Sequence, residues 1–247
     1  MVADLFPDLS TFSFERLVET ALEDLVLVKA VAAELERRPP SHEAAERVVR
    51  AFTEGRADSW LTAVLLGRIG HESGYATARE ILLSGHLGAE HAGAALARIR
   101  GERAIDDLRD ALLVARTLRS RESAAAGLAR VGPNAVGPVL AASIDGQIRW
   151  QTGAGILAAL LIEPTVVAEL FGSDNERGPK LATEILWGVV RRAESDGDYG
   201  DAQRWLDHAK GLLIEPLQRI LASPATNMAP RKRRALEPWV SGAGRVL

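Results

Sequence analysis

Three aspartates, Asp106, Asp107 and Asp110, form the cluster in this sequence that has the clearest potential for chemistry. Two layers of carboxylates on one helical turn could hold a hard cation such as Mg²⁺. The residue between them, Leu108, falls at a position that we assign to the apolar face of a helix. We therefore interpret the cluster as a solvated acidic face and expect no metal ligands there.

The run Asp106-Asp107-Leu108-Arg109-Asp110 resembles the aspartate-rich motif with which isoprenoid synthases bind magnesium diphosphate. Those enzymes are also all-helical, so the resemblance implies an alternative in which the chain is an isoprenoid-type synthase. The sequence has no second motif of this kind at a suitable distance, and its aromatic content of 5% does not favour an aromatic-lined cavity. We keep this alternative as the least favoured one and expect the chain not to be an enzyme.

The other residue types that could do chemistry do not form a catalytic or metal-binding pattern. The sequence has no cysteine, which excludes disulfides, thiolate ligands and a cysteine nucleophile. Its histidines are not paired at metal spacing; they are His42, His71, His86, His91 and His208. There is no nucleophile elbow, phosphate-binding loop or dinucleotide fingerprint. We expect no catalytic, metal-binding or cofactor-binding residues.

The composition favours a helical protein without membrane segments. Of 247 residues, 47% are hydrophobic and 26% charged, and the abundance of Ala, Leu, Glu and Arg favours helix over strand. The longest apolar run, residues 154–162, is too short to cross a bilayer. The first residues do not read as a signal peptide. With a net charge of −3 there is no general attraction to nucleic acid or membranes, and we expect a cytoplasmic location.

Residues 1–57 read as an N-terminal helical cap. Ser13 could cap a helix that begins at Phe14. Apolar residues then recur at helical spacing; they are Leu17, Ala21, Leu25, Val28, Ala32 and Leu35. The pair Pro39-Pro40 ends this helix, and Ser41 begins the next one, which Gly55 terminates.

From residue 58 the chain repeats at intervals of about thirty residues, which is typical of stacked helical hairpins. Four segments align without gaps on a single apolar residue that we call the anchor; the anchors are Leu66, Leu96, Leu128 and Ile156. Small residues precede every anchor by three and four positions, where a helix packed inside a stack needs close contacts. A second helix follows each of these segments, so the predicted unit is helix, tight turn, helix.

The pattern of an apolar residue and Arg, a small pair, then Ala-Leu-Gly resembles the bacterial HEAT-like repeats named after the phycobilisome lyase subunits. Arg121 and Arg149 match the Arg of that repeat, whereas Ala129 replaces its Gly. The resemblance covers residues 58–171 and implies an all-α fold, a right-handed α-solenoid of HEAT-like helical hairpins. It does not imply bilin chemistry. Residues 172–247 are less regular helical repeats and a cap, and we expect one continuous domain.

The repeat alignment also predicts an exposed stripe. Positions six before, two before and two after each anchor are four residues apart and lie outside the core. Stacked helices would place three arginines in a row, and beside them a row of two tryptophans and two glutamates. The predicted partner-binding residues are Trp60, Arg68, Glu90, Arg98, Glu122, Arg130 and Trp150. Exposed Trp beside Arg is typical of interface hot spots.

Our preferred interpretation is a non-catalytic protein–protein interaction scaffold, adaptor or inhibitor of bacterial type that binds its partner protein in a concave groove. The first alternative is a nucleic-acid-binding or DNA-repair protein that uses the arginine ladder, since helix-repeat glycosylases for alkylated bases share this fold class. The run Arg231-Lys232-Arg233-Arg234 could also contact phosphate.

Overall fold

The chain forms helices throughout the part that the computed structural model describes, which comprises residues 8–85, 88–195, 200–222 and 228–240. These residues contain no strand, so the predicted all-α class is confirmed for them. None of their helices combines the length and the apolar character needed to cross a bilayer. The chain divides into two compact units, Met1–Ala135 and Val136–Leu247. The predicted division into a cap (residues 1–57), a repeat region (58–171) and a less regular C-terminal part (172–247) stays a prediction.

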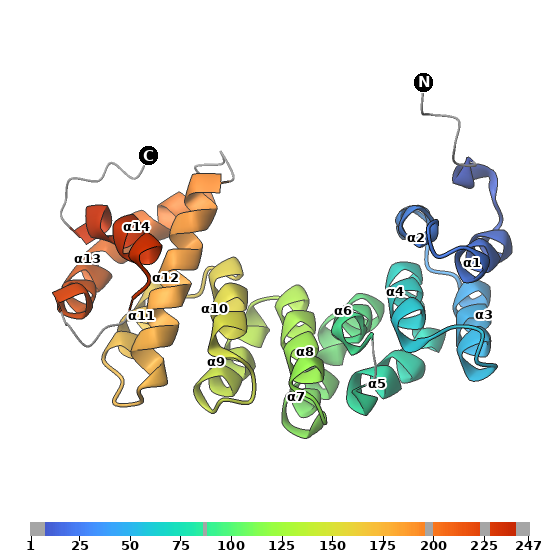
Figure 1. Ribbon diagram of the computed structural model, residues 1–247, viewed down its shortest axis with the longest axis horizontal. Helices are drawn as coiled ribbons and strands as arrows, with labels where there is room; N and C mark the ends of the chain where they lie inside the picture. Colours follow the sequence, from blue (N-terminus) through green and yellow to red (C-terminus); the bar gives the residue numbers. More distant parts are fainter. Residues whose placement is uncertain (1–7, 86–87, 196–199, 223–227, 241–247) are drawn as a thin grey trace. The chain divides into compact units, whose positions relative to one another are not determined.

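The first unit is a succession of short helices joined by tight turns (Figure 1). In chain order they are η1 (Leu9–Thr11), α1 (Phe14–Glu23), α2 (Val28–Arg37), α3 (His42–Thr53), α4 (Ser59–Ile69), η2 (Glu72–Gly74), α5 (Tyr75–Ser84), α6 (Ala89–Arg100), η3 (Gly101–Ala104), α7 (Ile105–Val114), α8 (Leu118–Val131) and η4 (Pro133–Ala135). Helix α4 packs against α2 and α6, and α6 packs against α8. Helices α5 and α7 pack beside them, α5 against α6 and α7 against α8.

The helix starts in the N-terminal part follow the predicted caps, but the first helix does not continue as predicted. The Ser13 side chain accepts a hydrogen bond from the Arg16 N–H at 3.2 Å, and Ser41 caps α3 in the same way. The predicted helix through Leu25 is wrong, because the chain turns between α1 and α2. The Asp24 carboxylate accepts the N–H of Val26 at 2.9 Å, which stabilises a turn in place of helix. Leu25 and Val26 are therefore 65% and 77% exposed.

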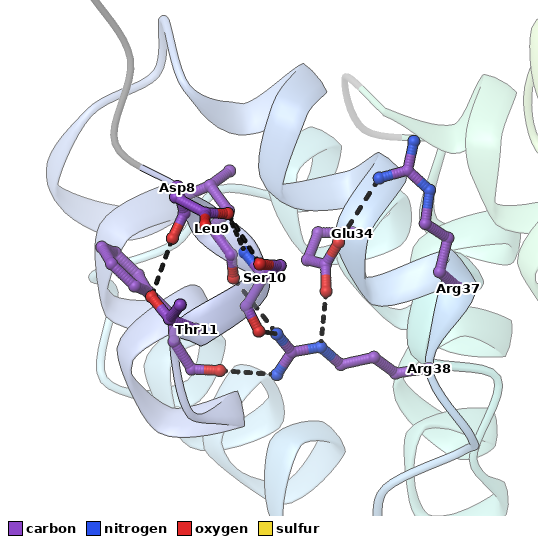
Figure 2. A network of polar contacts seen from close by, with 8 residues as sticks. Asp8, Leu9, Ser10, Thr11, Glu34, Arg37 and Arg38 are labelled. Atoms are coloured by element: carbon purple, nitrogen blue, oxygen red, sulfur yellow. Dashed lines mark hydrogen bonds and ion pairs between the residues drawn. The ribbon is translucent and has the colours of Figure 1, made fainter. Parts of the chain in front are cut away.

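The end of α2 is fixed to the N-terminal segment by Arg38 (Figure 2). Its guanidinium donates to three backbone carbonyls, those of Leu9, Ser10 and Phe12, at 3.1, 3.1 and 2.6 Å. It also pairs with the buried Glu34 at 2.9 Å. The Arg38 guanidinium thus donates both to the buried Glu34 carboxylate and to the backbone carbonyls of the N-terminal segment, and it stabilises both.

Helices α6 and α8 approach so closely that only glycine fits at two positions. A Cβ at Gly93 would lie 2.5 Å from the Ser123 carbonyl carbon, and one at Gly127 would lie 2.7 Å from the Gly93 carbonyl carbon. The Gly93 N–H donates to the buried Ser123 Oγ at 3.0 Å. Gly93 is three residues before the anchor Leu96, so close packing at the predicted small position is confirmed for α6, whereas Gly127 directly precedes the anchor Leu128.

The second unit contains α9 (Val136–Ile144), α10 (Trp150–Ala159), α11 (Pro164–Phe171), α12 (Arg177–Ser195), α13 (Asp201–Ala222) and α14 (Pro230–Val240). Helix α10 packs against α9 and α12, and α13 packs against α11, α12 and α14. The anchors Leu66, Leu96 and Leu128 of the first unit are fully buried, as predicted.

In α10 the predicted register is wrong by one residue. Leu157 is fully buried, whereas the predicted anchor Ile156 is only half-buried. The cause is Gly153, which faces Ser143 of α9 so closely that a Cβ would lie 2.9 Å from the Ser143 Cβ. Leu157 is one turn further on this face, and Ile156 is rotated away from it. The alignment of Arg149 with Arg121 therefore selected the wrong one of two adjacent apolar residues.

Candidate functional site

A groove with a volume of about 510 Å³ lies on one face of the first unit. Side chains from α2, α4 and α6 line it, together with Leu25 before α2 and Arg130 in the last turn of α8. Its central lining consists of small and apolar residues: Ala32, Ala33, Ala63, Val64, Gly67, Ala94 and Ala95. A volume of this size is in the range of natural ligand-binding pockets.

Helices α4 and α6 run in the same direction along this groove. At the beginnings of α4 and α6 the rings of Trp60 and His91 pack edge to face, with centroids 6.2 Å apart. At their ends Arg68 and Arg98 both contact Glu36, which is in the last turn of α2. Equivalent turns of α4 and α6 are therefore level with one another, and the groove has an aromatic end and a charged end.

At the charged end one carboxylate is shared by two arginines. Arg68 forms an ion pair with Glu36, and Arg98 donates to Glu36 Oε1 at 3.4 Å and to the Glu36 carbonyl at 3.5 Å. The three side chains are between 40% and 44% exposed. Ion pairs at such exposure are screened by water and contribute little stability. Arg130 has no ion-pair partner among the residues that the structure describes.

The structure brings four of the seven predicted partner-binding residues to this groove: Trp60, Arg68, Arg98 and Arg130. Glu90 and Glu122 are not among its lining residues; Glu90 pairs with Arg119 at 3.6 Å, and Glu122 is half-buried in α8.

Trp150 belongs to the second unit and is not part of the groove. With the corrected register of α10 it also leaves the predicted stripe, since Ala154 and Ala158 are buried. The exposed residues at that spacing are Gln151, Gly155 and Ala159.

The sequence interpretation missed the contribution of α2, which we had assigned to a cap. Glu36 and Lys29 are charged lining residues from this helix, and Val28 of α2 and Leu25 before it are apolar lining residues. The spacing of Lys29, Ala33 and Glu36 is helical and could have marked a second face of α2. It could not show that this face looks toward α4 and α6, because the sequence outside the repeats gives no alignment with them.

The carboxylate of Asp107 in the aspartate cluster is directed to groups other than a metal. It accepts hydrogen bonds from the Tyr75 hydroxyl at 2.6 Å and from Arg79 Nε at 2.8 Å. The hydroxyl, followed by Arg79, holds the pKa of Asp107 below its ordinary value. Burial, and then the hydrogen bond to Asp107, raises the pKa of Tyr75 to about 12. Arg100 covers the Tyr75 ring at 3.5 Å from its centroid.

The neighbouring Asp106 is 94% exposed and lies 3.7 Å from Arg109. Within the described ranges no group of three or more carboxylate, histidine or cysteine side chains is arranged to hold a metal ion. Asp107 therefore joins α5 to α7.

The basic run near the C-terminus is also partly used within the protein. Lys232 forms an ion pair with Glu184 and lies 4.9 Å from the centre of the Trp187 ring, and burial lowers its pKa. Arg233 donates to the Leu221 carbonyl at 3.0 Å. Two of the four cations thus stabilise the packing of α14, and Arg231 and Arg234 are the exposed ones.

Comparisons of the chain with models of protein families, with curated proteins and with solved structures found no match.

Proposed function

We propose that this chain is a non-catalytic protein–protein interaction module, a scaffold, adaptor or inhibitor, that binds a partner protein in the groove of its first unit. The observation that carries the proposal is the groove itself, in which four independently predicted surface residues, Trp60, Arg68, Arg98 and Arg130, come together. Trp and Arg are the residue types most enriched in interface hot spots. We place this module in the cytoplasm.

The proposal includes the architecture on which the groove depends. The order helix, tight turn, helix in the first unit supports stacked HEAT-like hairpins, which present equivalent helices side by side. Such a surface is preformed, so that binding orders few groups and its entropic cost is small. A right-handed solenoid over residues 58–171 is the extension of this proposal to the whole repeat region.

Nucleic acid is the second candidate, because Arg68, Arg98 and Arg130 line the same groove. The Glu36 carboxylate between two of these arginines opposes a phosphate backbone, which favours the protein partner. The double variant Arg98→Glu/Arg130→Glu tests this candidate in titrations with nucleic acid at several salt concentrations. If the wild type has no affinity for nucleic acid at low salt, this candidate is removed.

The protein partner is tested with a photo-crosslinking amino acid at Val64, in the middle of the groove, and affinity capture from the native host. We expect Arg98→Glu to lower recovery of the crosslinked protein at least tenfold, because loss of a hot-spot arginine typically weakens an interface by at least this factor. The matched control is Arg109→Glu, the same charge reversal on the exposed face of α7. Equal recovery by both variants would show that the groove is not the binding site.

A further inference from the structure

The two ends of the groove differ in chemistry, and the distance between them is set by helix geometry. At one end the half-buried indole of Trp60 offers apolar surface. At the other end lie Arg68 and Arg98. Trp60 and Arg68 are eight residues apart on α4, which corresponds to about 12 Å along the helix axis. A ligand that filled the groove would therefore need two different groups at that separation.

The charged end has more hydrogen-bonding capacity than Glu36 can use. Arg98 reaches Glu36 only at 3.4 and 3.5 Å, at the long limit for such bonds, and Arg130 has no ion-pair partner in the described part of the chain. Four cations line the groove against one carboxylate, although the whole chain has a net charge of −3. The excess of positive charge is thus local to the groove.

On the assumption that the proposed function is correct, we propose that the groove binds a peptide segment of a partner protein that carries an apolar side chain and a carboxylate about 12 Å apart. The carboxylate of the ligand replaces Glu36 between Arg68 and Arg98, and the apolar side chain lies against Trp60. Glu36 then acts as an internal competitor that occupies the arginines when no partner is bound. Because these side chains are between 40% and 44% exposed, water screens their ion pairs, and displacing Glu36 requires little free energy.

A peptide fits these observations better than a nucleic acid does. A phosphate backbone carries a negative charge on every nucleotide and has no apolar side chain for the end of the groove that Trp60 lines. A single carboxylate matches the planar guanidinium groups, which bind carboxylates in a two-pronged geometry. The small residues between the two ends, such as Ala63 and Ala94, leave space for the backbone of a peptide.

The proposal is tested by selecting dodecapeptides from a random phage-displayed library on the full chain and measuring the affinity of selected peptides by fluorescence anisotropy. We expect enrichment of peptides that have an acidic residue and an apolar residue. Arg98→Gln should weaken binding of these peptides about tenfold. Glu36→Gln, which removes the competitor without changing size, should strengthen it about threefold or more. Arg109→Gln on α7 is the matched control and should leave the affinity unchanged.

Each other outcome overturns the inference in a distinguishable way. Peptides that lack acidic residues but are lost in Val64→Glu would contradict the carboxylate and leave the proposed function intact. Weaker binding in Glu36→Gln would show that Glu36 positions the arginines and does not compete with a ligand. Binding that neither Val64→Glu nor Arg98→Gln affects would overturn the groove as the site for both proposals. A library without any enriched peptide, or a duplex DNA that binds more tightly and is released by Arg98→Gln, would overturn the peptide assignment alone.

Discussion

Replacing Gly93 by alanine should destabilise the first unit, although alanine is the better helix former. In an unconstrained helix the change from Gly to Ala stabilises by about 1 kcal/mol. At Gly93 the new Cβ would lie 2.5 Å from the Ser123 carbonyl carbon, whereas ordinary contacts between carbons begin near about 3.5 Å. Helices α6 and α8 would therefore have to move apart by about 1 Å.

A separation of this size has two costs. It removes a large part of the dispersion contacts between α6 and α8, and overpacking of this kind typically costs about 3 kcal/mol at the upper end. It also breaks the buried hydrogen bond from the Gly93 N–H to Ser123 Oγ, which contributes about 1 kcal/mol. After the gain in helix propensity, we expect Gly93→Ala to lower the free energy of unfolding by about 3 kcal/mol.

The assay is urea unfolding followed by circular dichroism, with hydrogen exchange of α6 and α8 as the local readout. Ser123→Ala isolates the hydrogen bond and should cost only about 1 kcal/mol. Gly155→Ala on the exposed side of α10, where a Cβ meets nothing within 4 Å, should stabilise by up to about 1 kcal/mol. If Gly93→Ala is as stable as the wild type, the close approach of α6 and α8 is not rigid and the reasoning is refuted.

Three further predictions concern the polar networks. Arg38→Ala should lower the free energy of unfolding by about 3 kcal/mol, because it leaves the buried Glu34 carboxylate with only the exposed Arg37 as an ion-pair partner and removes the donor for three backbone carbonyls. Arg37 is 76% exposed, so Arg37→Ala should change the free energy of unfolding by less than about 0.5 kcal/mol. Equal effects of the two variants in urea unfolding would contradict this reasoning. The raised pKa of Tyr75 means that its neutral phenol stabilises the fold fully below pH 10, and that this contribution disappears as the pH rises to about 12. Wild-type stability should therefore fall over that range more steeply than that of Tyr75→Phe, with tyrosinate absorbance reporting the ionisation. The lowered pKa of Asp107 gives the opposite pH dependence: its ionised carboxylate stabilises the fold above the ordinary pKa of 3.8, and this contribution is lost as the pH falls below that value. The difference in free energy of unfolding between wild type and Asp107→Asn should therefore disappear at low pH. A difference that stays constant with pH would count against the network.

The helical class, the caps at Ser13 and Ser41 and the first three anchors follow from the sequence because each depends on a local pattern. The turn at Asp24 was missed because apolar spacing continues through Leu25, and only the side-chain hydrogen bond of Asp24 decides against helix. In α10 the sequence offers Ile156 and Leu157 in succession, and the contact of Gly153 with α9 selects between them. In both cases a specific contact overrides a periodic signal.

The groove was predictable to the extent that it is built from repeated positions. Arg68 and Arg98 are equivalent residues of aligned segments, so that side-by-side packing of α4 and α6 brings them together. Glu36 comes from a helix outside the alignment, and its position between these arginines depends on how α2 packs against α4. The repeat alignment therefore predicted Arg68 and Arg98 but could not predict Glu36, the carboxylate that they share.

The common direction of α4 and α6 also has an electrostatic consequence. The dipoles of parallel helices add, and the free carbonyl groups at their ends give this side of the first unit a partial negative charge. Arg68 and Arg98 lie in the last turns of their helices, where this field favours cations even without a bound carboxylate.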